Sequence, residues 1–299
     1  MIPRVAQRTT ARLLSLASRG LGALGRGAED AQLVTRYLRG LVEFRPRADD
    51  IWVATYPRSG TTWVQFLLYQ LTTDGDMGFH HLTDVSPWFE RSLALGHCRA
   101  LDFEAVPSPR VFKSHLTPGW LPAGGRVVYV ERAPEDVVVS YYHFYRSHLG
   151  YSGDFDAFYS RFEAGNLQYG RWTDHVSEWA EVAETRPVLR LTYEGLRQDP
   201  ERTVHRLCRF LNLGPGADVV HRALERSRFD FMKAHEAKFD HVTAVLRERG
   251  LTPSAFLRKG TGGEGRTMLS ASRRAALERA RHRTPRRRGR RADLARFLH

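Results

Sequence analysis

The stretch Thr55-Tyr56-Pro57-Arg58-Ser59-Gly60-Thr61-Thr62-Trp63 decides the fold of this 299-residue chain. It closes a β-branched and aromatic run at 51–56, which predicts a buried strand. Apolar residues recur at helical spacing from Thr61 onward, so the order is strand, tight loop, helix. The glycine lets the backbone approach a ligand closely, and the loop N–H groups, two threonine hydroxyls and the helix N-terminus point at one small volume. The stretch therefore predicts an anion cradle, with an ordinary Pro-Gly turn as the alternative.

The pattern around this loop predicts an α/β fold. Further strands are expected at 110–113, 126–130 and 188–191, and helices near 135–149, 171–184, 200–212 and 217–226. Alternation of this kind is typical of a parallel sheet with helices on both faces. We therefore expect a P-loop-like three-layer fold with a central parallel β-sheet flanked by helices. Nothing in the chain reads G-x-x-x-x-G-K-[ST], so a conventional NTPase is disfavoured.

Composition favours a soluble protein of the cytoplasm. Hydrophobic residues make up 42% and charged residues 26%, and no run approaches the roughly 18 apolar residues of a membrane helix. The two cysteines, Cys98 and Cys208, are far apart, so they suggest no disulfide framework and no metal site. The formal net charge is +13, and the seven arginines between Arg281 and Arg291 account for more than half of it. The remaining positive charge suits an anionic ligand.

Both ends of the chain are basic and differ from the middle. Residues 1–43 predict a basic amphipathic segment, either a helix packed on the domain or a membrane surface, or a mitochondrial presequence. Residues 270–299 predict a C-terminal helix followed by an arginine-rich tail. We expect weak contact of these ends with anionic lipid at most, no transmembrane segment and no specific nucleic acid. Residues 44–269 are then the catalytic domain.

Two more motifs follow predicted strands. The first is Phe112-Lys113-Ser114-His115-Leu116, in which an imidazole could remove a proton from a hydroxyl near neutral pH. The second is Arg132-Ala133-Pro134-Glu135-Asp136-Val137-Val138-Val139-Ser140-Tyr141-Tyr142, in which an arginine and a hydroxyl near a helix start could hold a phosphate. Taken alone, the histidine could be structural and the second motif a capped helix turn. Their occurrence together with the loop at 55–63 favours the functional interpretation.

Together the three motifs resemble those of the cytosolic sulfotransferase family, whose donor is 3′-phosphoadenosine 5′-phosphosulfate (PAPS). The family loop is usually T-Y-P-K-S-G-T-T-W, and here only Arg58 differs, standing where lysine is usual. The second motif matches K-[ST]-H-L, in which the histidine is the catalytic base. The third matches R-x-P-x-D-x-x-x-S-Y-Y, which implies that Arg132 and Ser140 hold the 3′-phosphate. The resemblance runs from about Phe44 to Gly263.

Later segments add the remaining implied nucleotide contacts. By resemblance, Tyr193 approaches the adenosine and Phe229 stacks opposite Trp63 on the adenine. The full set implied for the nucleotide is Arg58, Ser59, Gly60, Thr61, Thr62, Trp63, Arg132, Ser140, Tyr193, Ser227, Phe229, Met232, Arg258, Lys259 and Gly260. Phe144 matches an aromatic residue of the acceptor pocket, and Trp88 and Phe89 are candidates for its apolar wall.

The implied activity is transfer of a sulfuryl group from PAPS to a hydroxyl or amine of a small acceptor. His115 is the general base, Lys113 and Arg58 neutralise charge on the transferred group, and no metal is required. Phenols, alcohols, amines and lipids all fit as acceptors. The alternatives are a P-loop kinase of small molecules and a catalytically impaired sulfotransferase-like binding protein. The second is favoured by Gly265, because the family usually has tryptophan there, in a segment that closes over the nucleotide.

Three other patterns carry little weight. The G-x-G-x-x-G at 20–25 has no strand before it, so the dinucleotide interpretation lacks its context. His235-Glu236 is followed by His241, too late for an H-E-x-x-H zinc helix, and His80-His81 has no evident partner ligands. The short dimer element of animal members is not evident, so the oligomeric state stays open.

Overall fold

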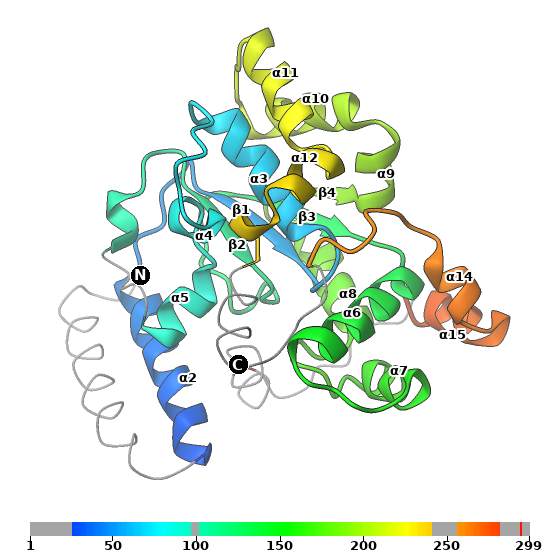
Figure 1. Ribbon diagram of the computed structural model, residues 1–299. Coiled ribbons are helices and arrows are strands. Elements are labelled where there is room, and N and C mark those ends of the chain that lie inside the picture. The colour runs from blue at the N-terminus through cyan, green and yellow to red at the C-terminus, as the bar shows by residue number, and fades with distance from the viewer. Residues whose placement is uncertain (1–25, 97–101, 241–255, 282–293, 295–299) are drawn as a thin grey trace.

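A parallel four-stranded sheet lies at the centre of the computed structural model, which describes residues 26–96, 102–240, 256–281 and 294 (Figure 1). The strands are β1 (Ile51–Thr55), β2 (Val111–Ser114), β3 (Arg126–Glu131) and β4 (Val188–Thr192), in the spatial order β2-β1-β3-β4. Ile51 pairs with Val111 on one side and with Arg126 on the other. The predicted parallel sheet is confirmed, with strand ends within a residue or two of those expected.

Alternating side chains of β1 build two cores, one on each face of the sheet. Ile51 and Val53 belong to the core that packs against α3, α10 and α11, whereas Trp52 and Ala54 belong to the core that packs against α2, α5, α6 and α8. Figure 1 shows these two groups on opposite sides of the strands. The helices are α2 (Arg26–Glu43), α3 (Thr61–Thr72), α5 (Phe89–Leu95), α6 (Pro134–His148), α8 (Trp172–Val182), α10 (Pro200–Leu211) and α11 (Ala217–Arg226). The three-layer prediction is confirmed.

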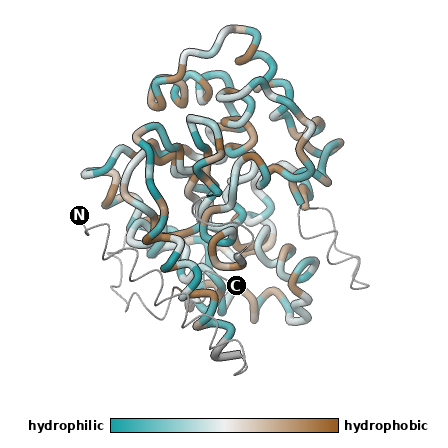
Figure 2. Tube along the Cα trace, turned by 90° about the vertical axis from the view of Figure 1, so that its left-hand side faces the viewer, coloured by the Kyte–Doolittle hydropathy of each residue, from teal (hydrophilic) through white to brown (hydrophobic). Residues whose placement is uncertain are grey.

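The starts of α6 and α10 have a local cause. Pro134 and Pro200 open α6 and α10, where the missing N–H costs nothing, and the Asp199 carboxylate accepts from the Arg202 N–H. Polar and apolar residues alternate along the outer helices, as one buried face requires (Figure 2). The shorter elements are α4 (Leu82–Val85), η1 (Asp102–Ala105), α7 (Phe155–Ala164), α9 (Tyr193–Gln198), α12 (Phe229–Ala234), η2 (Glu236–Lys238), α14 (Glu264–Met268) and α15 (Ala271–Arg281).

The strand order creates a switch point at the carboxyl end of β1. The chain moves from β1 to β2 on one side and then crosses to β3 on the other, with α3 on one face and α6 on the opposite face. Ligands of open α/β sheets bind outside the carboxyl ends of the strands at such a point. The loop 56–60 lies there.

The opposite, amino-terminal edge of the sheet is closed by a buried ion pair. The Arg110 guanidinium is fully buried and donates to both carboxylate oxygens of Asp50, at 2.7 and 2.8 Å. It also lies over the rings of Phe44 and Phe112. A paired and hydrogen-bonded charge of this kind is tolerated in a core, whereas removing one partner is strongly destabilising.

The N-terminal helix α2 packs on this body. Its Tyr37 is fully buried, and the hydroxyl donates to the Trp120 carbonyl oxygen at 2.5 Å. Within the described ranges, no helix is long and apolar enough to cross a membrane. Several features discussed above lie outside those ranges: residues 1–25 with the glycine pattern, Cys98, His241 and most of the arginine-rich tail.

Candidate active site

A cavity of about 310 Å³ opens at the carboxyl edge of the sheet. Its walls come from the loop after β1, the ends of β2 and β3, the start of α9 and the segment 256–261. Every residue that the sequence implied for catalysis or ligand binding lines it except Ser59 and Phe89, which are both buried. The lining residues that sequence reasoning did not assign are Pro57, Arg91, Tyr141, Leu149, Gln168, Tyr169, Phe256, Leu257 and Thr261.

The loop after β1 has an unusual backbone. Arg58 has φ +68° and Gly60 has φ +94°, so two of its residues adopt the left-handed conformation, which is costly for a side chain such as that of arginine. A Cβ atom on Gly60 would lie 2.8 Å from Cδ2 of Tyr193, so that position is restricted to glycine by space as well. The Ser59 hydroxyl is buried and has no hydrogen-bond partner among the described residues. A tight, partly unsatisfied loop of this kind suits an anionic ligand.

The geometry of His115 fixes its tautomer. Its Nδ1 lies 2.9 Å from the Thr55 carbonyl oxygen, which can only accept a hydrogen bond. Nδ1 therefore carries the proton, and Nε2 is left as an acceptor. Burial and the nearby Lys113 hold the pKa of His115 well below its usual value, so the imidazole is neutral at pH 7. A neutral imidazole with an available Nε2 can accept a proton.

Two buried residues that the sequence did not reveal hold the backbone of His115. The Glu90 carboxylate accepts from the His115 N–H at 2.8 Å, and His175 Nε2 donates to the His115 carbonyl oxygen at 3.1 Å. Burial lowers the pKa of His175 to about 4, so it stays neutral. Neither residue stands in a recognisable motif, and only the folded chain brings them to His115.

The Lys113 ammonium lies over the Trp88 indole, 3.8 Å from the ring centroid. Burial lowers the pKa of Lys113 to about 7, and the negative charge of Glu90 opposes this shift. Glu90 is itself fully buried, and it accepts from the Trp88 indole N–H at 2.7 Å. Trp88 thus lines the cavity as expected. Phe89 was expected there too, but it starts α5 and is buried in the core against Phe44 instead.

Arg58 and Ser140, from separate motifs, are in direct contact. The Arg58 Nε donates to the Ser140 hydroxyl at 3.2 Å, and its guanidinium lies 5.0 Å from the ring centroids of both Phe144 and Phe256. Burial lowers the pKa of Arg58 to about 10, which leaves it charged at neutral pH. Arg132 donates to the Arg58 carbonyl oxygen at 3.1 Å, and its Nε is buried without a partner in the described chain. These groups form one cationic wall.

An aromatic slot continues from this wall. Trp63 and Tyr193 meet edge to face at 5.5 Å, and the Arg132 guanidinium lies 4.3 Å from the Tyr193 centroid. Phe229 is 39% exposed, unusual for so large an apolar ring, and contacts Gly260 so closely that a Cβ there would lie 2.2 Å from its Cδ2. An exposed aromatic face beside a cavity can stack on a planar ring of a ligand.

The segment that follows Gly260 is held in place through Gly265. The N–H groups of Gly263 and Gly265 donate to the two carboxylate oxygens of Asp136, at 2.7 and 2.9 Å. A Cβ on Gly265 would lie 2.4 Å from the carbonyl carbon of Glu135, so only glycine allows α14 to approach α6 this closely. The Asp136 carboxylate and the close contact at Gly265 therefore anchor this segment, where the family usually has a tryptophan.

Glu264 forms ion pairs with two cations of the cavity wall. Its carboxylate lies 3.1 Å from Nη1 of Arg258 and 3.1 Å from Nζ of Lys259. These two neighbours lower the pKa of Glu264 to about 2, so the carboxylate is charged throughout the neutral range. Arg258 and Lys259 therefore already have a counter-ion within the chain.

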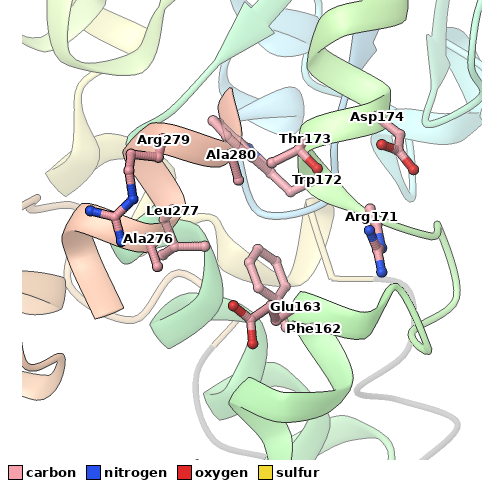
Figure 3. Close-up of a pocket in the computed structure, with 10 residues that line it drawn as sticks. All are labelled: Phe162, Glu163, Arg171, Trp172, Thr173, Asp174, Ala276, Leu277, Arg279 and Ala280. Atoms are coloured by element: carbon pink, nitrogen blue, oxygen red, sulfur yellow. The ribbon is translucent and has the colours of Figure 1, made fainter. Parts of the chain in front are cut away.

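A second cavity, of about 390 Å³, lies between α7, α8 and α15 and contains none of the predicted site residues (Figure 3). Its walls mix acidic and basic groups such as Glu163 and Arg279. In the described ranges, no three His, Cys, Asp or Glu side chains are grouped so that they could hold a metal ion. The first cavity is the candidate active site.

Comparisons with known proteins agree with this geometry. A family model described as "Sulfotransferase domain" matches residues 48–284. The chain belongs to this sulfotransferase family. It is 34% identical to dog sulfotransferase 1A1 over 247 residues, which is 79% of this chain and 83% of the relative. It is 32% identical to mouse sulfotransferase 1E1 over 77% of this chain and 81% of that protein. The predicted family and enzyme class are confirmed, and a kinase is not favoured.

Solved sulfotransferase structures have the same fold. The crystal structure of mouse sulfotransferase SULT7A1 contains adenosine 3′,5′-bisphosphate (PAP). That protein is 24% identical to this chain and superimposes with a TM-score of 0.65, covering 82% of this chain and 86% of its own. A retinol dehydratase structure, with androsterone and PAP, is 23% identical with a TM-score of 0.68, covering 82% and 84% of the two chains. The P-loop-like fold prediction is confirmed by both.

Proposed function

We propose that this sulfotransferase transfers the sulfuryl group of PAPS to a hydroxyl or amine of a small acceptor, with His115 as general base. The observation that carries the proposal is the hydrogen bond from His115 Nδ1 to the Thr55 carbonyl oxygen, which leaves Nε2 as the proton acceptor. Thr55, which fixes this tautomer, directly precedes the loop that builds the anion cradle. The backbone carbonyl that orients the base and the loop that would bind the anion are therefore adjacent in the chain.

The residues of the cavity fit the donor. PAPS, when bound, supplies the sulfuryl group, and adenosine 3′,5′-bisphosphate (PAP) is the leaving part. The loop around Gly60 would hold the 5′-phosphosulfate, and the unpartnered Ser59 hydroxyl and Arg132 Nε are donors of the kind that such an anion needs. Arg132, Ser140, Arg258, Lys259 and Gly260 would hold the 3′-phosphate. Thr61, Thr62, Trp63, Tyr193, Ser227, Phe229 and Met232 would surround the rest of the nucleotide.

The acceptor would lie between His115 and Phe144. As the new bond to sulfur forms, His115 Nε2 takes the proton of the acceptor hydroxyl or amine. The positive charges of Lys113 and Arg58 balance the negative charge that develops on the sulfuryl and bridging oxygens. Fixed cations and N–H donors can supply this stabilisation without a metal ion.

Replacing His115 with Ala tests the proposal. Turnover of labelled PAPS should fall by roughly 10²–10⁴-fold, the usual contribution of a general base, while calorimetry should find PAP bound as before. His205→Ala is the matched control, since this exposed histidine of α10 lies outside the cavity. Unchanged turnover in His115→Ala would refute the role of the base. Absence of PAP binding in the unaltered protein would refute the proposed function itself.

A further inference from the structure

The charge of the cavity wall is one-sided. Among the described residues that line it, six are basic and none is acidic. Two carboxylates lie behind the wall: Glu90 under the Trp88 indole and Glu264 on Arg258 and Lys259. The six lining cations are Arg58, Arg91, Lys113, Arg132, Arg258 and Lys259.

The proposed donor accounts for five of these cations. Arg58 and Lys113 are placed for the sulfuryl group, and Arg132, Arg258 and Lys259 for the 3′-phosphate, if the function proposed above holds. Arg91 has no role in that scheme. It belongs to α5 and lies outside all three sequence motifs.

Arg91 and His115 both contact the indole of Trp88. The Arg91 guanidinium is 4.9 Å from the centroid of the Trp88 ring, and that ring meets the His115 imidazole edge to face at 5.3 Å. The guanidinium and the imidazole therefore share one aromatic neighbour. Tyr169 also meets the His115 imidazole edge to face, at 5.2 Å. Burial lowers the pKa of Lys113 and raises that of Tyr169, and the positive charge of Arg91 adds to the first shift and opposes the second, so its field reaches the same part of the cavity.

Apart from the cations and Gln168, the cavity beside His115 is lined mainly by aromatic and apolar side chains. Tyr141 and Phe144 of α6 line it, with ring centroids 6.5 Å apart, and half-exposed Leu149 stands at its edge. Such walls take up a flat ring, whereas a guanidinium beside them recognises a carboxylate by a bidentate, charge-assisted pair. The Arg58 guanidinium also lies near Phe144, but it is placed for the sulfuryl group in the proposed function. A cationic group brought to the same place would meet like charge, which specific sites use to reject wrong partners.

We propose that Arg91 selects the acceptor: the enzyme prefers aromatic hydroxyl compounds that carry an anionic group about one ring away from the hydroxyl, and it discriminates against protonated amines. This inference rests on the proposed function, since it assumes that the reacting hydroxyl lies at His115. It narrows the acceptor class from phenols, alcohols, amines and lipids to acidic phenols.

Three phenols that differ only in the para substituent test the selection: 4-hydroxyphenylacetate, 4-ethylphenol and tyramine. At saturating PAPS, kcat/KM should decrease in that order, by about tenfold for each step, as expected for one charge-assisted pair gained or one like-charge contact introduced. The readout is the ratio between acceptors, which cancels any general loss of activity. Arg91→Gln should reduce the ratio of anionic to neutral phenol to near one, and Arg91→Glu should favour tyramine.

Arg161→Gln is the matched control, because it removes one arginine charge from an exposed position of α7 outside the cavity. Its ratios should equal those of the unaltered protein. Where turnover of a phenol is too slow to measure, calorimetric binding of that phenol to the PAP-saturated enzyme gives the same comparison. The inference would be overturned if the ratios of kcat/KM between the phenols were the same in the unaltered protein and in Arg91→Glu. A preference of the unaltered protein for tyramine would also overturn it. Failure of PAP to bind would instead overturn the proposed function.

Discussion

Glu90→Gln should shift the alkaline limb of the pH profile of kcat/KM for PAPS to lower pH. The Glu90 carboxylate and the Lys113 ammonium contact the same indole, the first through the Trp88 N–H and the second over the ring face. Glutamine keeps an oxygen that can accept from both the Trp88 and His115 N–H groups, but it removes the negative charge. The variant therefore tests charge with little change in shape.

The magnitude follows from the pKa of Lys113, which burial lowers to about 7. As the pH rises through this value the ammonium loses its proton, so kcat/KM of the unaltered protein should fall about tenfold per pH unit above it. An opposite charge a few ångströms away typically shifts a pKa by about one to three units. Without the Glu90 charge, the pKa of Lys113 falls further, and the limb should begin about one unit or more lower. The other charged or titratable groups facing Lys113 are Arg58, Arg91, His81 and His115.

The assay is initial-rate turnover of labelled PAPS between pH 5.5 and 9.5, with PAP binding as the check that each variant is folded. Glu43→Gln is the control, because it removes a carboxylate from a surface pair with Arg39 on α2. Its profile should match that of the unaltered protein. An alkaline limb that stays in place in Glu90→Gln would refute the idea that Glu90 keeps Lys113 charged. So would a limb above pH 9 in the unaltered protein.

Two predictions concern the segment after Gly260. Gly265→Trp, which restores the usual family residue, should destabilise the fold by about 3 kcal/mol or more in urea unfolding, because its Cβ would lie 2.4 Å from backbone of α6. Gly214→Ala, where nothing lies within 4 Å of the added carbon, should stay within about 0.5 kcal/mol of the unaltered protein, and equal losses in the two variants would contradict the packing argument. Glu264→Gln should tighten PAP binding by about threefold at low salt and less at high salt, because it removes the counter-ion of Arg258 and Lys259. Weaker binding in calorimetry would mean that Glu264 positions these cations instead.

The sequence predicted the sheet and most of the cavity because both depend on local patterns. The β-branched run predicts the strand, Gly60 predicts the loop, and the apolar spacing after Thr61 predicts the helix. Because the strands are parallel, the residues that follow each strand meet at one edge of the sheet. His115 and Arg132 could therefore be placed without a structure. Glu90, His175 and Arg91 could not, since a buried carboxylate, a buried imidazole and a cation on a short helix have no spacing that marks them. Their roles arise from contacts between segments far apart in the chain.

Gly265 shows the same limit in another form. Judged against the family motif, it suggested a weakened closure over the nucleotide. In the structure the glycine permits a close contact with Glu135, and Asp136 accepts from the backbone on both sides of Glu264. A sequence motif cannot reveal this compensation, because Asp136 lies on α6 and Gly265 lies on α14.

The ion pair of Asp50 and Arg110 stands at the edge of the sheet remote from the chemistry. The stability of the fold therefore depends on the amino-terminal end of β1 and β2, whereas the proposed choice of acceptor depends on the cavity at the carboxyl end of the sheet. Libraries that vary Arg91, Phe144 and Leu149 to reach new acceptors can therefore leave the ion pair of Asp50 and Arg110 intact. Such libraries should retain a high share of folded members, whereas libraries centred on Asp50 should lose most of theirs.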